Sequence, residues 1–352
     1  MARRTLSSLW AMLLVAVVVF SLAMPARATF PGKNGRIAFV GGNLGPNGGD
    51  IFTMKSDGSD VKQLTTFADN GGAACCGSWS PNGGQLVFAA FPAGASTYQL
   101  WMMNADGSNQ HQLLNDSNGF DLQPNFSPDG SQIVFNRFSS VFQGAIYRIQ
   151  ADGSGLTALV DFDPNPDISD FNPVYSPDGR RIAFDSIDRS GLIYAVYVMN
   201  ADGSQLHALS PPWLEAWIPD WSPDSKKMIF STRALYPQNT LTSQGWLMST
   251  DADDAELEQI TFPGKSRDLG PVWSPQGNAI AFERDSPDGR TFAIYVTNPD
   301  GSGEHLIFQG PRSGAATFFS PLGRVLGRGK EKPDLRLIQT GAQAPRWGPA
   351  QE

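Results

Sequence analysis

The chain has 352 residues, of which 41% are hydrophobic, and its formal net charge at pH 7 is −8. This length and hydrophobic content allow a large buried core. An acidic surface repels phosphate backbones and anionic membranes, so the composition argues against nucleic acid as a partner.

The first 28 residues show the three parts of a secretory signal peptide. Arg3 and Arg4 precede an apolar run over 9–24, and Ala26-Arg27-Ala28 provides small residues for cleavage. We expect cleavage after Ala28, export to the periplasm or the extracellular space, and no membrane insertion of the mature chain. Retention as an N-terminal anchor is the alternative, although the run is short for a spanning helix. Cleavage removes three Arg and no acid, which lowers the net charge to −11.

An aromatic-Ser-Pro element recurs six times along the chain. Its serines are separated by 47, 49, 46, 52 and 46 residues, at Ser80, Ser127, Ser176, Ser222, Ser274 and Ser320. In the clearest copy, Tyr175-Ser176-Pro177-Asp178-Gly179 is followed by Asn200-Ala201-Asp202-Gly203-Ser204, and both segments have the composition of tight turns. A period in the forties with such turns is typical of a β-propeller blade.

Three further β-rich runs follow in each repeat. We expect second strands at 36–40, 86–90, 133–136, 182–185, 228–231 and 279–283, and third strands at 51–54, 100–103, 146–149, 196–199, 246–249 and 294–297. Fourth strands are expected at 61–64, 110–114, 156–160, 206–209, 257–260 and 304–308. The sequence therefore predicts an all-β, six-bladed propeller of four-stranded antiparallel blades over residues 29–321.

The first repeat lacks an aromatic-Ser-Pro strand, and the last such element, at Phe319, has no complete blade after it. We therefore expect the C-terminal strand to pair with the N-terminal blade, which would protect both edges. A partial seventh blade over 324–338 is the alternative. Residues 322–352 show no periodicity and are expected to form a partly disordered tail.

The repeated aromatic-Ser-Pro-Asp-Gly and Asn-Ala-Asp-Gly-Ser segments resemble those of the TolB-like propeller family over about 290 residues. Departures are local, since Asn82 and Gln276 replace the turn Asp and Ser225 replaces the turn Gly. TolB itself carries an α/β domain before its propeller, whereas here the repeats follow the signal peptide directly. Related propellers occur in serine peptidases, but the chain has no Gly-x-Ser-x-Gly motif, which argues against peptidase activity.

The two cysteines, Cys75 and Cys76, are adjacent in the sequence. Either a vicinal disulfide or an unpaired loop pair is open to them in an oxidising compartment.

The three histidines, His111, His207 and His305, each follow a turn Asp by five residues. This places them on the outermost strands of separate blades, so they cannot share one metal ion. We assign no metal and no cofactor.

Long connections alternate with the tight turns and are expected on one face of the ring, where binding sites usually lie. In three blades an Asp stands three residues before the Pro of the inner strand, at Asp121, Asp170 and Asp268. These residues form either an acidic rim for a cation or basic ligand, or caps of the turn into each blade.

Aromatic residues in the same connections form a second candidate surface: Trp213, Trp217, Phe120, Phe171 and Tyr236. Exposed aromatic side chains suit a protein partner or the faces of a sugar ring. Burial beneath the loops is the alternative.

We therefore expect an exported, monomeric binding or interaction module whose loop-rich face binds an envelope or secreted protein. The alternatives are a carbohydrate- or cation-binding protein, or a propeller enzyme of the polysaccharide lyase or hydrolase class with an Asp-lined site. No catalytic residue is assigned.

Overall fold

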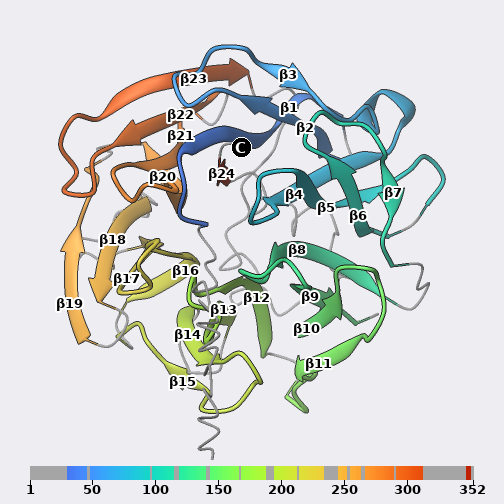
Figure 1. Ribbon diagram of the computed structural model, residues 1–352. Helices are drawn as coiled ribbons and strands as arrows, with labels where there is room; N and C mark the ends of the chain where they lie inside the picture. The colour runs from blue at the N-terminus through green and yellow to red at the C-terminus, as the bar shows by residue number, and fades with distance from the viewer. Residues whose placement is uncertain are drawn as a thin grey trace, which may run out of the picture.

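A computed structural model describes residues 30–45, 48–95, 97–114, 119–139, 143–165, 168–187, 194–211, 214–233, 245–251, 254–262, 266–288, 291–311 and 346–349. Within these ranges the chain forms β-strands and one short 3-10 helix, η1 (Ala68–Asn70). No helix in this part of the chain is long and apolar enough to cross a membrane. The expected signal peptide lies outside the described residues. Figure 1 shows four-stranded sheets arranged radially around a central axis.

Five of the sheets each consist of four strands that are consecutive in sequence, paired antiparallel. Their strands are β4 (Ala73–Trp79), β5 (Gln85–Phe91), β6 (Gln99–Asn104) and β7 (His111–Gln112); β8 (Phe120–Phe126), β9 (Gln132–Phe138), β10 (Gly144–Gln150) and β11 (Thr157–Val160); β12 (Ser169–Tyr175), β13 (Arg181–Ile187), β14 (Ala195–Asn200) and β15 (His207–Ala208); β16 (Glu215–Trp221), β17 (Lys227–Arg233), β18 (Gly245–Asp251) and β19 (Asp254–Gln259); and β20 (Arg267–Trp273), β21 (Ile280–Asp285), β22 (Thr291–Thr297) and β23 (His305–Pro311). The fold is therefore an all-β propeller of four-stranded antiparallel blades.

A further four-stranded sheet joins the two ends of the chain in the order β24-β1-β2-β3. Its strands are β1 (Asn34–Gly45), β2 (Gly48–Met54), β3 (Lys62–Gln63) and β24 (Arg346–Pro349). Trp347 pairs with Ile37, as Trp79 pairs with Leu86 and Trp273 pairs with Ile280 in complete blades. The ring is thus closed by a C-terminal strand, as expected.

The closing strand lies in the segment that we expected to be a tail. Trp347-Gly348-Pro349 repeats the aromatic-Ser-Pro pattern with Gly in place of Ser, and the propeller extends beyond residue 321 for this reason. Phe319, and the residues of the alternative seventh blade, lie outside the described residues.

The Ser-Pro-Asp-Gly segments form the turns between first and second strands. The Ser176 hydroxyl donates to Asp178 Oδ1 at 2.6 Å and accepts from the Arg181 backbone N–H at 2.9 Å. The same pair of contacts forms around Ser127 and Ser222. These bonds satisfy the backbone of the turn locally and explain why Ser and Asp recur together.

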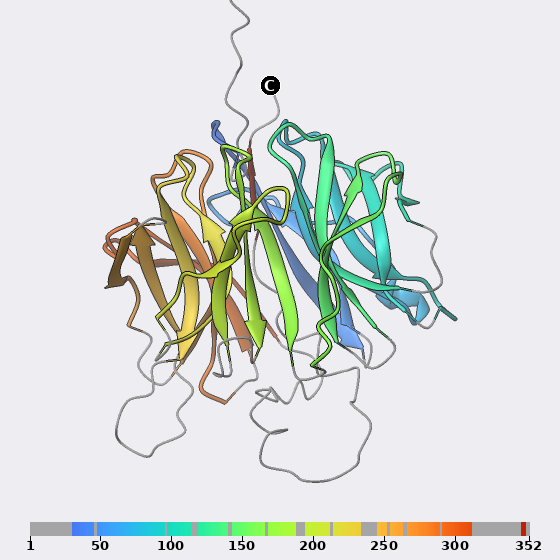
Figure 2. The ribbon, with the colours of Figure 1, turned by 90° about the horizontal axis from the view of Figure 1, so that it is seen from below.

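The Asp-Gly turns join third and fourth strands and also hold neighbouring blades together. Gly153 has a φ of 86°, and a Cβ atom there would lie 2.3 Å from the carbonyl oxygen of Leu113 in the preceding blade. Gly58, Gly107, Gly203 and Gly301 make the same close approach to the preceding blade. Because the strands of each blade are antiparallel, the turns between first and second strands and those between third and fourth strands lie on the same face of the ring, seen from the side in Figure 2.

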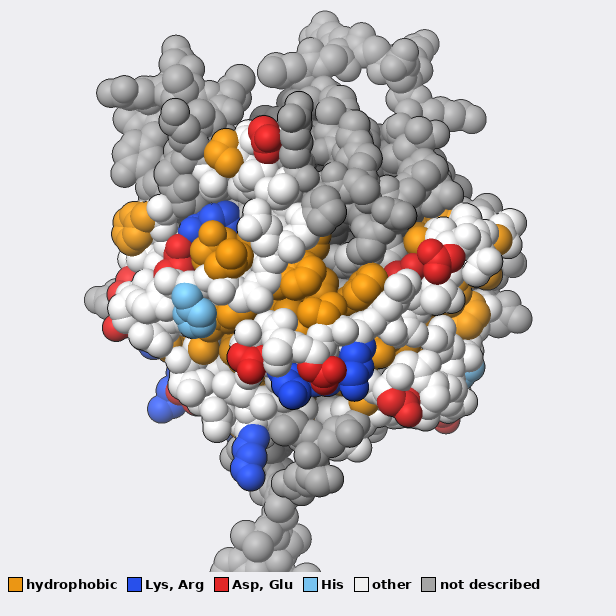
Figure 3. Space-filling view, turned by 90° about the horizontal axis from the view of Figure 1, so that it is seen from above, with side chains coloured by type: hydrophobic (Ala, Val, Ile, Leu, Met, Phe, Trp, Pro, Cys, Tyr) orange, Lys and Arg blue, Asp and Glu red, His pale blue; other side chains and the backbone are white. Residues whose placement is uncertain are grey.

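The last and first blades pack through an aromatic cluster. The ring centroids of Phe39 and Phe308 are 4.8 Å apart, and Phe52 and Phe292 complete the contact. Phe52 and Phe308 are only partly buried, and Leu306, on the same strand as Phe308, is 47% exposed. Figure 3, a view onto this side of the ring, shows hydrophobic side chains gathered in the middle of the surface.

Candidate functional site: the channel wall and the loop face

The inner strands of the five complete blades share a bulge three residues before their aromatic residue. The bulged residue has positive φ in every case, with values from 51° to 60°: Cys76, Gln123, Asn172, Ile218 and Gly270. A bulge bends the strand and redirects a side chain. Because the inner strands surround the ring axis (Figure 1), these residues lie on the strands that border the central channel typical of a propeller.

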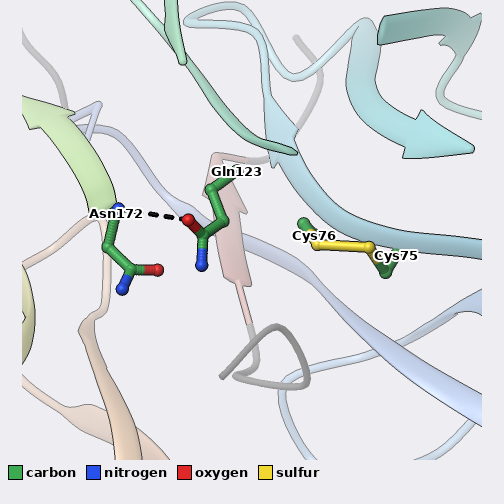
Figure 4. The surroundings of a disulfide bond; sticks show 4 residues. All are labelled: Cys75, Cys76, Gln123 and Asn172. Atoms are coloured by element: carbon green, nitrogen blue, oxygen red, sulfur yellow. Dashed lines mark hydrogen bonds between the residues drawn. A yellow bond between two sulfur atoms is a disulfide. The ribbon is translucent and has the colours of Figure 1, made fainter. Parts of the chain in front are cut away.

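Two of these bulged residues belong to a buried polar network. Gln123 Oε1 accepts the backbone N–H of Asn172 at 3.2 Å, and Asn172 Nδ2 donates to Asp185 Oδ1 at 2.8 Å. The same Asp185 oxygen accepts the backbone N–H of Ile218 in the next blade at 3.0 Å. The network therefore links three consecutive blades. Figure 4 shows its contact between Gln123 and Asn172.

Asp185, which accepts two hydrogen bonds of this network, is 1% exposed. Burial raises the pKa of its carboxyl to about 7, and the hydrogen bonds from Ile218 and Asn172 oppose this rise only in part. The nearby Asp170 carboxylate raises the pKa further. Asp185 is therefore poised to change its charge near neutral pH.

Asn136 occupies the position in β9 that Asp185 occupies in β13, since each pairs with the residue just before the bulge. Ser231 is the equivalent residue in β17, and its hydroxyl accepts the backbone N–H of the bulged Gly270 in the next blade. The Asn136 side chain is 0% exposed, and neither of its amide atoms has a hydrogen-bond partner among the described residues.

Cys75 and Cys76 form a disulfide at the bulge of β4. Both are buried, at 7% and 8% exposure, and Figure 4 shows Gln123 and Asn172 in their surroundings. Gln123, Asn172 and Ile218 adopt the same bulged backbone without a disulfide. The disulfide is therefore not required to form the bulge.

The three Asp residues of the expected acidic rim lie on first strands but are buried, with exposures of 0%, 1% and 0% for Asp121, Asp170 and Asp268. Asp121 forms a bidentate ion pair with Arg137 at 2.7 and 2.9 Å. The expectation of an exposed acidic rim is therefore wrong for these side chains. The residue paired with Asp121 or with Asp268 on the second strand is an arginine, which compensates the buried negative charge.

Asp268 repeats this arrangement in the last complete blade. It pairs with Arg284 at 2.6 and 2.8 Å, and Arg284 also contacts Glu304 and lies over the ring of Tyr295. Burial raises the pKa of Asp268 although Arg284 and Thr261 bind its charged form. These contacts join β20, β21 and β22 to the residue that directly precedes β23, which is a structural role.

The structure brings two of the five candidate aromatic residues together. Phe138 lies 5.3 Å from Phe120 and 5.6 Å from Phe171, measured between ring centroids. Phe120 is buried, whereas Phe171 is only partly buried. Trp213 and Tyr236 lie outside the described residues.

Trp217 is also partly buried, and its ring packs against Tyr194 with centroids 5.8 Å apart. Phe171, Trp217 and Leu269 occupy the same position, four residues before the aromatic of their strands, in three consecutive blades. All three keep partial exposure, whereas the equivalent Cys75 and Leu122 are buried. The three side chains define an apolar row, which we call the Phe171–Trp217–Leu269 row.

The three histidines begin the outer strands of separate blades, at β7, β15 and β23, and all are exposed. In each, Nδ1 contacts the carbonyl oxygen two residues earlier. Among the described residues no group of three His, Cys, Asp or Glu side chains could hold a metal ion.

Sequence reasoning missed the bulged residues. A signal was present, because Gln123, Asn172, Ile218 and Gly270 each directly precede a Pro two residues before the aromatic. Asp185 and Asn136 gave no such signal, because they look like ordinary residues of a second strand.

The radial, four-stranded antiparallel blades and the closing strand define this molecule as a β-propeller. Residues 95–343 match the family described as TolB beta propeller domain, and the chain belongs to this family.

Curated relatives include an uncharacterized protein of Agrobacterium fabrum, 29% identical over 167 residues, which are 46% of this chain and 54% of that protein. The Tol-Pal system protein TolB of Gluconobacter oxydans is 40% identical over 103 residues, which are 22% of each chain. The chain thus spans only a fifth to about half of the length of these relatives. The crystal structure of TolB from Acinetobacter baumannii has a similar fold, with a TM-score of 0.65 and 17% identity over 90% of this chain and 67% of that one.

Proposed function

We propose that this protein is an exported interaction module that binds a protein partner at its loop-rich face. The observation that carries this proposal is the Phe171–Trp217–Leu269 row, in which three consecutive blades present partly exposed apolar side chains at one strand position. Rigid, equivalent positions of this kind form a preorganised docking surface, and aromatic side chains dominate the binding energy of protein interfaces.

The partner we propose is an envelope or secreted protein. The signal-peptide pattern of residues 1–28 supports export, and relatives in the same family are named as proteins of the Tol-Pal system. The excess of acidic residues favours a partner with a neutral or basic surface, because like charges repel at short range.

The test is affinity capture from envelope and secreted fractions with the mature protein and a Trp217→Ala variant. A partner of this face should be captured by the wild type and lost, or reduced at least tenfold, with the variant. A Trp213→Ala/Trp217→Ala double variant extends the test to the second tryptophan of the candidate set.

The matched controls are Val61→Ala and Leu306→Ala, which remove exposed apolar side chains from the outer rim. They should capture the partner as well as the wild type. Equal capture by the Trp217 variant, or loss only with the rim variants, would place the interface elsewhere and refute the proposal.

A further inference from the structure

We propose that the protein binds a small inorganic anion of about the size of chloride between its first blade, β24-β1-β2-β3, and the next blade, where Arg346 and the bulge of β4 line one cavity. This site is separate from the Phe171–Trp217–Leu269 row and does not depend on the proposed protein partner. The proposal rests on the cavity, on a backbone N–H group without an acceptor, and on the cation beside it.

The cavity lies where the closing sheet meets β4. Residues of β1, β2, β4 and β24 line it, among them Ala38, Val40, Ile51, Cys76, Gly77 and Arg346. It has room for about one water-sized guest. Arg346 is partly exposed, so an ion can reach it from solvent. A guest of this size is a water molecule or a monatomic ion.

The backbone N–H of the bulged Cys76 lacks an acceptor. In the blade that begins with β16, the equivalent Ile218 donates its N–H to Asp185 of the preceding blade at 3.0 Å. Val40 occupies the position of Asp185 in the first blade, three residues after the residue that pairs with the aromatic of the inner strand. A valine side chain accepts no hydrogen bond, and no other described residue accepts the Cys76 N–H. Because Val40 and Cys76 line the same cavity, we expect this N–H group to bind the guest.

Arg346 is the cation of the site. The adjacent Trp347 is buried in the cluster between the last blade and the first, and successive side chains of a strand point to opposite sides. Arg346 therefore points towards β4, where it lines the cavity with Cys76. The equivalent residue of β16 is Asp220, whose carboxylate accepts the Trp273 N–H of the next blade at 2.8 Å. A guanidinium group only donates hydrogen bonds, so Arg346 cannot act as an acceptor in this way.

No carboxylate of the described residues forms an ion pair with Arg346. Burial lowers the pKa of its guanidinium, and the Asp220 carboxylate opposes this only in part. An anion in the cavity would accept hydrogen bonds from Arg346 and from the Cys76 N–H and would also neutralise the charge, whereas a water molecule would only accept the hydrogen bonds. The site therefore favours a monatomic anion, and chloride has a suitable size.

The experiment is thermal unfolding of the full mature protein in sodium gluconate, with chloride replacing gluconate at constant ionic strength. Gluconate is too large for the cavity. If chloride binds the folded chain, the unfolding temperature should be higher by about 2 °C or more at about 0.15 M chloride and should rise with the chloride concentration. In crystals soaked with sodium bromide, an anomalous peak should lie beside Arg346 and the Cys76 nitrogen.

Two variants test the two donors. Arg346→Met removes the cation, and Val40→Thr supplies a hydroxyl that can accept the N–H group, as Ser231 does for Gly270. Each should weaken chloride binding at least tenfold, seen as loss of the chloride-dependent rise. In gluconate both should unfold at the temperature of the wild type or higher, because each removes an unmatched donor or supplies its acceptor. Arg180→Met removes an exposed arginine and should respond to chloride like the wild type.

Three results would each overturn the proposal. The wild type would unfold at the same temperature in chloride and in gluconate, Arg346→Met would keep the response to chloride, or bromide would give no anomalous peak in the cavity. An ordered water alone would then fill the space between Arg346 and Cys76.

Discussion

Asp185 shows how strongly a single residue depends on the assembled ring. Its sequence context, between Phe184 and Ser186 on a second strand, is that of a solvent-facing acid, yet the carboxyl is buried among three blades. Burial raises its pKa to about 7. The folded chain therefore holds this proton at pH values where the unfolded chain has released it.

The first prediction concerns pH. The pKa of Asp185 is higher in the folded than in the unfolded chain, so its protonation stabilises the folded chain. This contribution to the free energy of unfolding is fully present below about pH 4 and is lost as the pH rises towards 7. The neutral side chain of Asp185→Asn does not titrate. Between about pH 4 and pH 7 the free energy of unfolding of this variant should therefore rise relative to that of the wild type by up to about 4 kcal/mol. Urea unfolding at a series of pH values measures the difference.

The control for this prediction is Asp57→Asn. Hydrogen bonds from Ser59 lower the pKa of Asp57, so its contribution is present at neutral pH and is lost as the pH falls. The free energy of unfolding of Asp57→Asn should therefore rise relative to that of the wild type only as the pH falls. A pH-independent difference for Asp185→Asn would contradict a raised pKa.

The second prediction concerns the ion pair of Asp121 and Arg137, whose side chains are 0% and 8% exposed. Arg137→Met leaves a buried carboxylate without its cation and should cost about 3–5 kcal/mol of unfolding free energy. The double variant Asp121→Leu/Arg137→Met removes both charges and should recover most of that loss. Equal losses in the single and double variants, measured by urea unfolding, would mean that the pair does not act as a unit.

At the scale of elements, the Asp-Gly turn both reverses the chain and joins blades. A glycine is required by positive φ in many turns, but Gly153 also lies against the Leu113 carbonyl of the preceding blade. The Asp152 carboxylate secures the turn by accepting the Ser154 hydroxyl and backbone N–H. The repeated Asp-Gly-Ser sequence therefore serves both an inter-blade contact and a turn.

The third prediction separates these two roles of glycine. Gly153→Ala adds a methyl group that would lie 2.3 Å from the Leu113 oxygen, whereas Gly94→Ala, at a φ of 84°, meets nothing within 4 Å. Gly94→Ala should cost about 1 kcal/mol for backbone strain, and Gly153→Ala clearly more, on the order of 2–4 kcal/mol. Similar losses for both variants in urea unfolding would argue against a tight inter-blade contact.

At the scale of the whole molecule, closure depends on four residues near the C-terminus. β24 pairs with β1 and packs against the next blade, where Gly348 lies so close to the Trp79 ring that a Cβ atom would clash with it. Trp347 is buried in the cluster that joins the last blade to the first. Without β24 the edge of β1 would be unpaired.

The fourth prediction is that a chain ending at residue 345 is destabilised by several kcal/mol, since it loses a buried tryptophan and a strand pairing. Backbone amides of β1 should exchange with solvent much faster in this variant, as measured by hydrogen–deuterium exchange. A chain ending at Pro349 keeps β24 and should behave like the full chain. Equal protection of β1 in both truncated chains would show that β24 does not close the ring.

The sequence by itself determined the repeat, the strand order within each blade and the tight turns, because these depend on local turn chemistry and on alternation over a few residues. It also predicted that a C-terminal strand completes the first blade. The closing strand was not expected within residues 322–352, because Gly348 replaces the Ser of the repeated pattern and the surrounding residues show no periodicity.

Only the tertiary structure decided which polar residues are buried. Asp121 and Asp268 looked like rim acids, and their cations Arg137 and Arg284 lie sixteen residues later on a paired strand. The contact between Gln123 and Asn172 joins different blades across 49 residues. Such contacts depend on how complete blades pack around the axis. No local sequence pattern indicates which residues of different blades meet.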